Sequence, residues 1–104
     1  YDDARNAYRS ALRHDPRCCE AAYNLGLLAE DQGDVEAAIA HYRMAIDLSS
    51  DYADAHFNLA GALARMGRVA EAALHWRRYL ELDAGRPWAR IARTHLELIA
   101  RPEE

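Results

Sequence analysis

Lysine is absent from this sequence of 104 residues. All 13 basic residues are arginines, against 17 aspartates and glutamates, which gives a formal net charge of −4 and a pI near 5.7. General nucleic-acid or anionic-membrane surfaces need an excess of basic side chains, and this chain has the opposite balance. We therefore expect neither nucleic acid nor membrane among its direct partners.

Residues typical of strands and of membrane spans are also scarce. Val, Ile and Thr together number 7, whereas alanine fills 22 positions and leucine 12. Strands favour β-branched residues and helices favour Ala, Leu, Arg and Glu, so the composition predicts an all-α fold. Apolar runs extend over a few residues only, far below the roughly 20 that cross a bilayer. The length suits one ordinary domain.

Cysteine is limited to two neighbours, Cys18 and Cys19. Adjacent cysteines cannot cross-link distant parts of a chain, and a ring between them is strained. We expect free thiols in a reducing, cytoplasmic compartment, with a redox or metal role as the alternative. The first residue is Tyr1 rather than Met, which favours a piece of a longer chain, so a targeting signal could lie outside it.

The sequence repeats itself at a spacing of 34 residues. Small, aromatic and apolar residues recur in register: Ala4, Ala38 and Ala72; Tyr8, Tyr42 and Trp76; Leu12, Ile46 and Leu80. Gly33 and Gly67 stand where a left-handed residue can end a helix, and Asp34 can cap the next one. Each unit is predicted to be two helices joined by a tight turn. The expected helices span residues 2–14, 19–32, 35–48, 53–66, 69–82 and 87–100.

These repeats resemble the tetratricopeptide repeat (TPR) family over essentially the whole chain. The matching residues are Leu25-Gly26, Ala38-x3-Tyr42 and Ala45 in one unit, Leu59-Ala60, Ala72-x3-Trp76 and Ala84 in the next, and Ala4-x3-Tyr8, Ala11 and Pro16 in a leading half-unit. Ala22 and His56 depart from the pattern at a position where the family favours Trp. The resemblance implies antiparallel helix-turn-helix repeats stacked in a right-handed superhelix with a concave inner surface.

In this register the chain is one TPR domain, residues 1–104. It divides into a half repeat that supplies a second helix only (1–18), two complete repeats (19–52 and 53–86), a capping helix (87–100) and a tail (101–104). The last helix is expected to cap the stack because polar Arg93, Thr94 and Glu97 occupy the stripe that a further helix would cover. The first helix instead presents an apolar face of Ala4, Tyr8 and Ala11. We therefore expect more chain upstream, or self-association through this face.

Catalytic and metal-binding motifs are missing from the sequence. The five histidines are His14, His41, His56, His75 and His95, and no two have the i, i+4 spacing of a helical metal site. The sequence contains no glycine-rich phosphate loop and no G-x-S-x-G nucleophile motif. We expect a protein that is not an enzyme and that needs no metal or cofactor.

The first helix of each pair is expected to line the concave side of the superhelix. Side chains there that face away from the partner helix form the candidate peptide-binding groove: Glu20, Tyr23, Asn24, Leu27, Glu30, Asp31, Asp54, Phe57, Asn58, Gly61, Arg65, Trp88, Ile91, Ala92 and His95. Aromatic rings supply apolar contact area, and the two asparagines can pair with a peptide backbone. The alternative for Tyr23, Phe57 and Ile91 is simple packing between adjacent first helices.

Acidic charge is concentrated in the first complete unit. Residues 19–52 sum to −6, against +1 for 1–18, +1 for 53–86 and zero for 87–104. An acidic groove favours a ligand with basic character. Some TPR proteins hold chaperone C-terminal carboxylates with a clamp of Lys, Arg and Asn. Glu20 and Asp54 stand where that clamp needs bases, so we do not expect this ligand.

The pattern as a whole predicts a non-catalytic module that binds a protein or peptide segment, apolar and basic in character, in its groove. The alternative is an assembly module that oligomerises a longer parent chain. The run 76–83 followed by Pro87-Trp88-Ala89 also resembles TPR modules of bacterial regulators, in which a separate domain binds DNA. The lysine-free, Ala/Arg-rich composition is typical of a GC-rich bacterial genome.

Overall fold

A computed structural model describes residues 19–83 and 85–100 of the chain. These residues form helices and turns without a strand. The helices are α2 (Cys19–Asp31), α3 (Val35–Leu48), α4 (Ala53–Arg65), α5 (Val69–Asp83) and α6 (Trp88–Ala100). Each observed end lies within one residue of its predicted position, so the all-α prediction is confirmed. The helix expected over 2–14 and its apolar face of Ala4, Tyr8 and Ala11 lie outside the described residues, as do Pro16 and Cys18.

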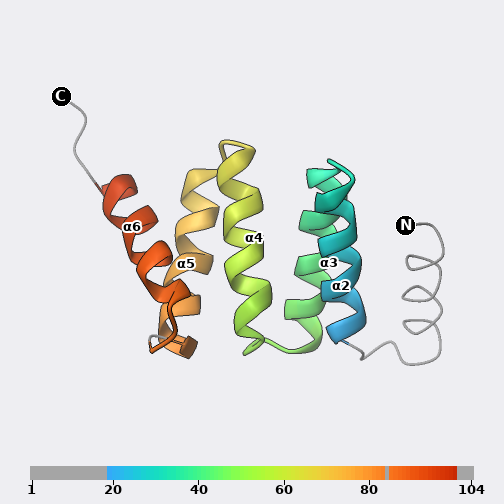
Figure 1. Ribbon diagram of the computed structural model, residues 1–104, viewed down its shortest axis with the longest axis horizontal. Helices are drawn as coiled ribbons and strands as arrows, with labels where there is room; N and C mark the ends of the chain where they lie inside the picture. Colours follow the sequence, from blue (N-terminus) through green and yellow to red (C-terminus); the bar gives the residue numbers. More distant parts are fainter. Residues whose placement is uncertain (1–18, 84, 101–104) are drawn as a thin grey trace.

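The helices are arranged as two hairpins and a final single helix (Figure 1). Helix α2 packs on α3, and α4 packs on α5. Helix α3 also packs on α4, which joins the two hairpins, and α6 packs on α5 at the end of the row. In this arrangement α2, α4 and α6 lie on the same side of the molecule, toward the viewer in Figure 1.

In both hairpins, a glycine with a left-handed backbone conformation lies in the turn between the two helices. Gly33 and Gly67 adopt left-handed φ values of 81° and 78°, a region that residues with a Cβ rarely enter. After Gly33, the amide of Asp34 donates to the carbonyl of Ala29 at 2.8 Å, and the Asp34 carboxylate accepts from the amide of Ala37 at 3.1 Å. The first contact ends α2 and the second begins α3.

The core of the first hairpin depends on the absence of a side chain at Gly26. A Cβ at this position would overlap the ring of Tyr42, which is fully buried. The three atoms nearest to the missing side chain all belong to Tyr42, so this ring limits how closely α2 can approach α3. It also belongs to the buried cluster that continues through Leu59 to Trp76.

The end of the row is held by aromatic stacking. The ring of Trp76 on α5 lies against the imidazole of His95 on α6, with centroids 4.6 Å apart and planes 5° from parallel. Ala89 and Ala92 are buried on the same side of α6. Their small side chains allow α6 to approach α5 closely.

Candidate peptide-binding groove

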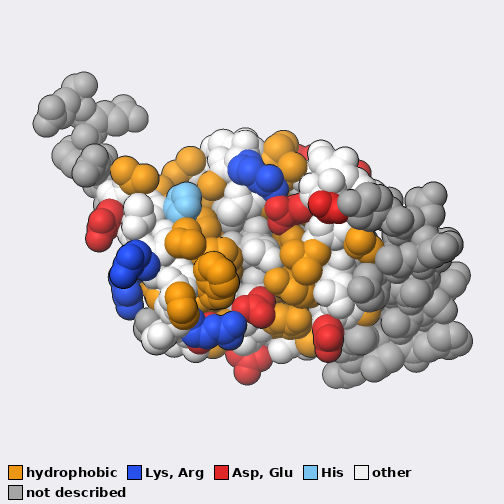
Figure 2. Space-filling model, viewed as in Figure 1, with side chains coloured by type: hydrophobic (Ala, Val, Ile, Leu, Met, Phe, Trp, Pro, Cys, Tyr) orange, Lys and Arg blue, Asp and Glu red, His pale blue; other side chains and the backbone are white. Residues whose placement is uncertain are grey.

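The residues predicted to form the groove occupy one face of α2, α4 and α6. Among the polar, aromatic and large apolar ones none is buried: Tyr23, Asn24, Glu30, Asp54, Phe57, Asn58 and His95 are half-buried, as is Gly61, and Glu20, Leu27, Asp31, Arg65, Trp88 and Ile91 are exposed. Ala92 is the exception, because it is fully buried against the rest of the fold. Figure 2 shows this face, with hydrophobic side chains gathered over α4 and α6 and most of the acidic ones over the α2 and α4 half.

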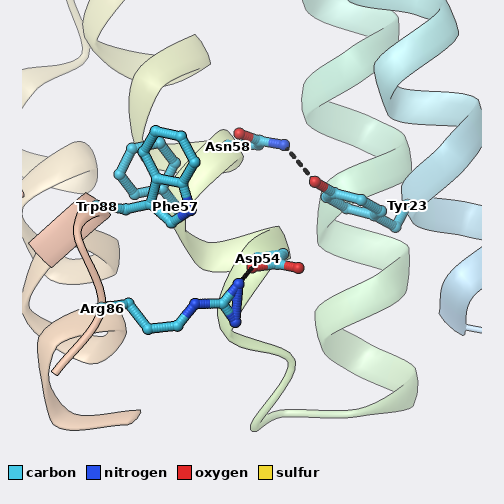
Figure 3. Close-up of a pocket in the computed structure, with 6 residues that line it drawn as sticks. All are labelled: Tyr23, Asp54, Phe57, Asn58, Arg86 and Trp88. Atoms are coloured by element: carbon cyan, nitrogen blue, oxygen red, sulfur yellow. Dashed lines mark hydrogen bonds and ion pairs between the residues drawn. The ribbon is translucent and has the colours of Figure 1, made fainter. Parts of the chain in front are cut away.

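A cavity of about 270 Å³ lies on this face. Its lining comes from α2, α4, the turn before α6 and α6 itself: Tyr23, Asp54, Phe57, Asn58, Arg86 and Trp88. Figure 3 shows Phe57 and Trp88 together on one side, Tyr23 opposite them, and Asp54 with Arg86 along the lower edge. Five of these six residues were predicted from the repeat register. Arg86 was missed because it lies in a turn, where the register of helix faces gives no orientation.

The aromatic wall of the cavity is partly fixed from behind. Phe57 makes edge contacts with Trp76 and Tyr79, at centroid distances of 5.3 and 5.0 Å, and its centroid lies 6.2 Å from that of Trp88. Phe57 therefore packs between helices and also lines the cavity, and its contact with a ligand stays a prediction. Trp88 keeps 49% of its surface exposed and Ile91 keeps 40%, and these two side chains present apolar area to solvent.

One hydrogen bond joins α2 to α4 across the cavity. The amide nitrogen of Asn58 donates to the hydroxyl oxygen of Tyr23 at 2.7 Å, and the amide oxygen of Asn58 is turned away from Tyr23 (Figure 3). Burial raises the pKa of Tyr23 and the charge of Asp54 adds to it, so the phenol stays neutral. Asn24 was expected to act like Asn58, but its side chain makes no hydrogen bond with another described residue. The two asparagines are therefore not equivalent.

Charged residues at the lower edge of the cavity compensate one another. The guanidinium of Arg86 lies 3.9 Å from the carboxylate of Asp54 and 3.2 Å from that of Asp83. Each of these contacts leaves Arg86 half exposed, so water screens it and a ligand can compete with it.

A second acid, Glu30, is also engaged. Its carboxylate forms an ion pair with Arg65 of α4 and accepts a hydrogen bond from the Tyr42 hydroxyl at 2.6 Å. Burial raises the pKa of Tyr42 well above its ordinary value, and the hydrogen bond to Glu30 raises it further. Glu20 and Asp31 form no ion pair with the described residues. The acidic character of the groove therefore rests on these two exposed acids more than on Glu30 or Asp54.

A second hollow of about 470 Å³ adjoins the cavity. It shares Phe57 and Asn58 with the cavity, and its other lining residues are Glu30, Gly61, Ala62, Ala64, Arg65 and His95. On α4 the cavity extends toward Asp54, and the second hollow extends toward Arg65. Together they form a trough that follows α4, whereas Glu20, Asn24, Leu27 and Asp31 of α2 lie outside both hollows.

The structure also contains a histidine pair that sequence reasoning did not find. The Nδ1 atoms of His56 on α4 and His75 on α5 lie 3.0 Å apart, and Nε2 of His56 lies 2.9 Å from the backbone carbonyl of Ser50. The carbonyl can only accept, so His56 carries its hydrogen on Nε2 and accepts at Nδ1 from His75. The signal available in the sequence was His56 at the position that is Ala22 in the preceding unit, together with His75, which lies one repeat after His41.

Both imidazoles are held neutral. Burial lowers the pKa of His75 to about 4, and the neighbouring His56 and Arg43 lower it too, against an opposing effect of Glu71. Burial likewise lowers the pKa of His56, with Arg78 contributing in the same direction and the Ser50 carbonyl opposing it. Within residues 19–83 and 85–100, no group of three or more His, Cys, Asp or Glu side chains is placed to hold a metal ion. None of the described helices has the length and apolar character needed to cross a membrane.

The repeat pattern and the fold agree with comparisons to known proteins. One sequence model of the tetratricopeptide repeat family matches residues 1–53, and a second matches residues 29–96. Each covers half of the chain or more. The chain belongs to the tetratricopeptide repeat family.

Two curated proteins share sequence with this chain. The probable biofilm formation methyltransferase WspC of Pseudomonas putida is 35% identical over 71 residues, which are 68% of this chain and 17% of that protein. An uncharacterized protein of Methanocaldococcus jannaschii is 43% identical over 53 residues, 51% of this chain and 62% of that protein. The chain thus spans less than two thirds of the length of either relative.

Solved structures show the same fold. The Yersinia enterocolitica type III secretion chaperone SycD, in complex with a peptide of the translocator YopD, has a TM-score of 0.84 at 23% identity, over 95% of this chain and 79% of that one. The first TPR of Spaghetti (RPAP3), bound to an HSP90 peptide, has a TM-score of 0.86 at 22% identity, over 97% and 83%. MamA has a TM-score of 0.81 at 26% identity, over 93% and 51%. These likenesses show that the chain shares the fold of these proteins.

Proposed function

We propose that this chain binds a segment of another protein, without catalysis, in the trough along α4. The observation that carries the proposal is the cavity of about 270 Å³ with a mixed lining: three aromatic rings, one amide and one acid–base pair. Such a lining accepts one apolar side chain and offers polar groups to the backbone on either side of it. Two structural neighbours, SycD and the first TPR of Spaghetti, are described with bound peptides, which supports a peptide as the ligand.

The apolar anchor of the ligand would lie between Phe57 and Trp88. Phe57 is fixed by Trp76 and Tyr79, so little side-chain freedom is lost when a ligand packs on it. Trp88 has almost half of its surface exposed and gains the most contact area on binding. These two rings would provide the main apolar contribution to affinity.

The polar part of recognition would come from Asn58. Its amide oxygen is turned away from Tyr23 and can accept a hydrogen bond from a ligand backbone amide (Figure 3). Exposed Glu20 and Asp31 would attract basic residues of the ligand and raise the association rate more than the affinity. The ligand is thus an apolar segment with basic character toward α2.

Selection from a displayed library of random dodecapeptides tests this proposal. Peptides that bind the whole chain are expected to carry an aromatic or large aliphatic residue, with Lys or Arg beside it. Phe57→Ala should weaken their binding by about tenfold or more, as expected for an interface anchor. Leu74→Ala is the matched control, because Leu74 is 61% exposed on α5 and lines neither hollow.

Two results would contradict the groove. The first is that the selected peptides bind the Phe57→Ala and Leu74→Ala variants equally well, with both variants folded by circular dichroism. The second is that no peptide is selected and sedimentation shows a concentration-dependent oligomer. That result favours the assembly role, in which the module joins copies of a longer parent chain.

A further inference from the structure

The start of α6 carries a basic surface that the repeat register did not predict. A shallow hollow of about 690 Å³ lies there, and its lining contains three arginines and no acid: Gly85, Arg86, Pro87, Trp88, Arg90, Ile91 and Arg93. We call these seven residues the arginine patch. Trp88 and Ile91 are the exposed apolar members of the patch.

The helical spacing of α6 explains this composition. Ala89 and Ala92 are buried, and Leu96 and Ile99 pack against the same core, so these four residues form the face turned toward α5. Arg90 lies on the side of α6 that points away from this core face. Trp88 and Ile91 lie between the core face and Arg90, along one flank of the helix. The helix therefore presents apolar and basic side chains next to each other and outside the core.

The patch is more basic than its surroundings. Arg86 is partly compensated by Asp83 and Asp54, but Arg90 forms no ion pair with a described residue. The molecule as a whole has a net charge of −4, and residues 19–52 alone sum to −6. The α2 end of this face is therefore acidic and the start of α6 is basic, as the colours in Figure 2 show for most of the side chains.

We propose that the arginine patch binds an acidic stretch of the same ligand that occupies the groove, an inference that rests on the proposed function. Trp88 lines both the cavity and the patch, so the two surfaces are continuous. Ligand carboxylates would contact Arg86 and Arg90, since guanidinium and carboxylate groups form paired hydrogen bonds. The ligand then has its acidic residues at α6, its anchor between Phe57 and Trp88, and its basic residues toward α2. This charge order fixes its direction in the groove.

A peptide fits this surface better than a nucleic acid does. The acids Asp54 and Asp83 lie next to Arg86 and would repel a long polyanion, and the remainder of the face toward α2 is acidic. A short stretch of carboxylates needs only the few arginines that are present. Nucleic-acid binding domains instead present a basic face over most of the contact area.

The test uses three kinds of synthetic peptide, each with one leucine-phenylalanine anchor. The block peptide has glutamates on one side of the anchor and arginines on the other. The second peptide has glutamines in place of the glutamates, and the third has the charges of the block peptide in mixed order. Binding to the full chain is measured by calorimetry and by the tryptophan emission, to which the exposed Trp88 contributes. The block peptide is made in two versions, with the acidic residues before the anchor or after it. One of these two versions should bind more tightly than the glutamine and mixed peptides.

The variants separate the patch from general electrostatics. Arg90→Glu should weaken block-peptide binding by about tenfold, since two charge units change at an exposed site, and should leave glutamine-peptide binding unchanged. Arg77→Glu is the matched control, because Arg77 is exposed on α5 and lines none of the three hollows. Equal losses in the two variants would overturn the proposal, and so would equal binding of the glutamine and block peptides.

The same data distinguish failure of the patch from failure of the groove. If Phe57→Ala abolishes block-peptide binding and Arg90→Glu does not change it, the patch proposal is wrong and the groove proposal stands. Dependence on Arg90 without dependence on Phe57 retains the patch and removes the groove. A duplex oligonucleotide that binds more tightly than the block peptide, and loses affinity in Arg90→Glu, would assign the patch to nucleic acid and overturn the peptide assignment.

Discussion

The two hairpins share one sequence register but are held together by different chemistry. In the first, α2 contacts α3 at Gly26, where the ring of Tyr42 occupies the space that a side chain at this position would need. In the second, α4 meets α5 through a hydrogen bond between His56 and His75, beside the aromatic contacts of Phe57. The positions equivalent to His56 and Gly26 are Ala22 and Ala60, so each hairpin has its special residue where the other has alanine. The repeat therefore sets the distance between helices, and individual positions set what stabilises it.

The largest effect is expected from giving both hairpins a side chain on a glycine. Gly26→Ala should lower the free energy of unfolding by about 1–3 kcal/mol, because the new Cβ overlaps a fully buried ring. Gly61→Ala is the matched change in α4, where the nearest atom, in the ring of Trp76, is 4.0 Å from the new Cβ. It should be neutral or stabilise by up to about 1 kcal/mol, since alanine is the better helix former. Urea unfolding of both variants measures this, and equal effects would show that the Gly26–Tyr42 contact is misplaced.

The histidine pair makes the second hairpin sensitive to acid. Folding holds His75 neutral with a pKa of about 4, whereas its unfolded pKa is the ordinary 6.5. Between these values the unfolded chain binds more protons, so this stability is complete above pH 6.5 and is lost as the pH falls toward 4. For a partly buried group the loss should be on the order of 1–2 kcal/mol after allowing for solvent screening.

Replacing the titrating partner tests that loss. His75→Gln can still donate to Nδ1 of His56 but cannot be protonated in this range. The difference in unfolding free energy between wild type and variant should therefore shrink as the pH is lowered from 7 to 4. A constant difference over this range would mean that the pair does not couple to acid.

A smaller effect separates the two asparagines. Asn58→Ala should lower stability by about 1 kcal/mol, because the half-buried Tyr23 hydroxyl loses its partner. Asn24→Ala should change stability by about 0.5 kcal/mol or less, since the Asn24 side chain makes no hydrogen bond with a described residue. A double-mutant cycle with Tyr23→Phe should recover most of the Asn58 effect as coupling. Absence of coupling would indicate that the contact does not form in solution.

The repeat explains which parts of this molecule could be predicted from sequence. Helix ends followed from Gly33, Asp34 and Gly67, whose roles depend on local backbone geometry. Helical spacing alone predicted that the polar and aromatic residues of the candidate groove share one partly exposed face of α2, α4 and α6. That this face binds a peptide stays a prediction. The pairing of individual side chains did not follow. Tyr23 with Asn58 and His56 with His75 depend on how two helices are rotated against each other, and a pattern within one helix carries no information on that.

The smallest expected difference in stability is between two glutamates, Glu30 in the groove and Glu71 on the surface of α5. Glu30 contacts two helices, through the Tyr42 hydroxyl on α3 and Arg65 on α4, and its side chain is 24% exposed. Glu71 bridges Arg43 on α3 and Arg68 near its own helix start, at 2.7 and 2.9 Å, and is 45% exposed. Both glutamates therefore join neighbouring hairpins, but only Glu30 accepts a hydrogen bond from a buried phenol.

This comparison predicts different salt dependence for the two sites. Glu30→Ala should lower stability by about 1 kcal/mol because the Tyr42 hydroxyl loses its acceptor, and most of that loss should persist at high salt because this hydrogen bond is shielded from solvent. Glu71→Ala should cost about 0.5 kcal/mol or less at low ionic strength, and salt should abolish the difference because both partners are exposed. Thermal unfolding of the two variants at low and high salt measures this. Equal salt dependence at the two sites would show that Glu30 acts only as an exposed ion pair. Water would then reach the contact between Glu30 and Tyr42 more freely than the structure indicates.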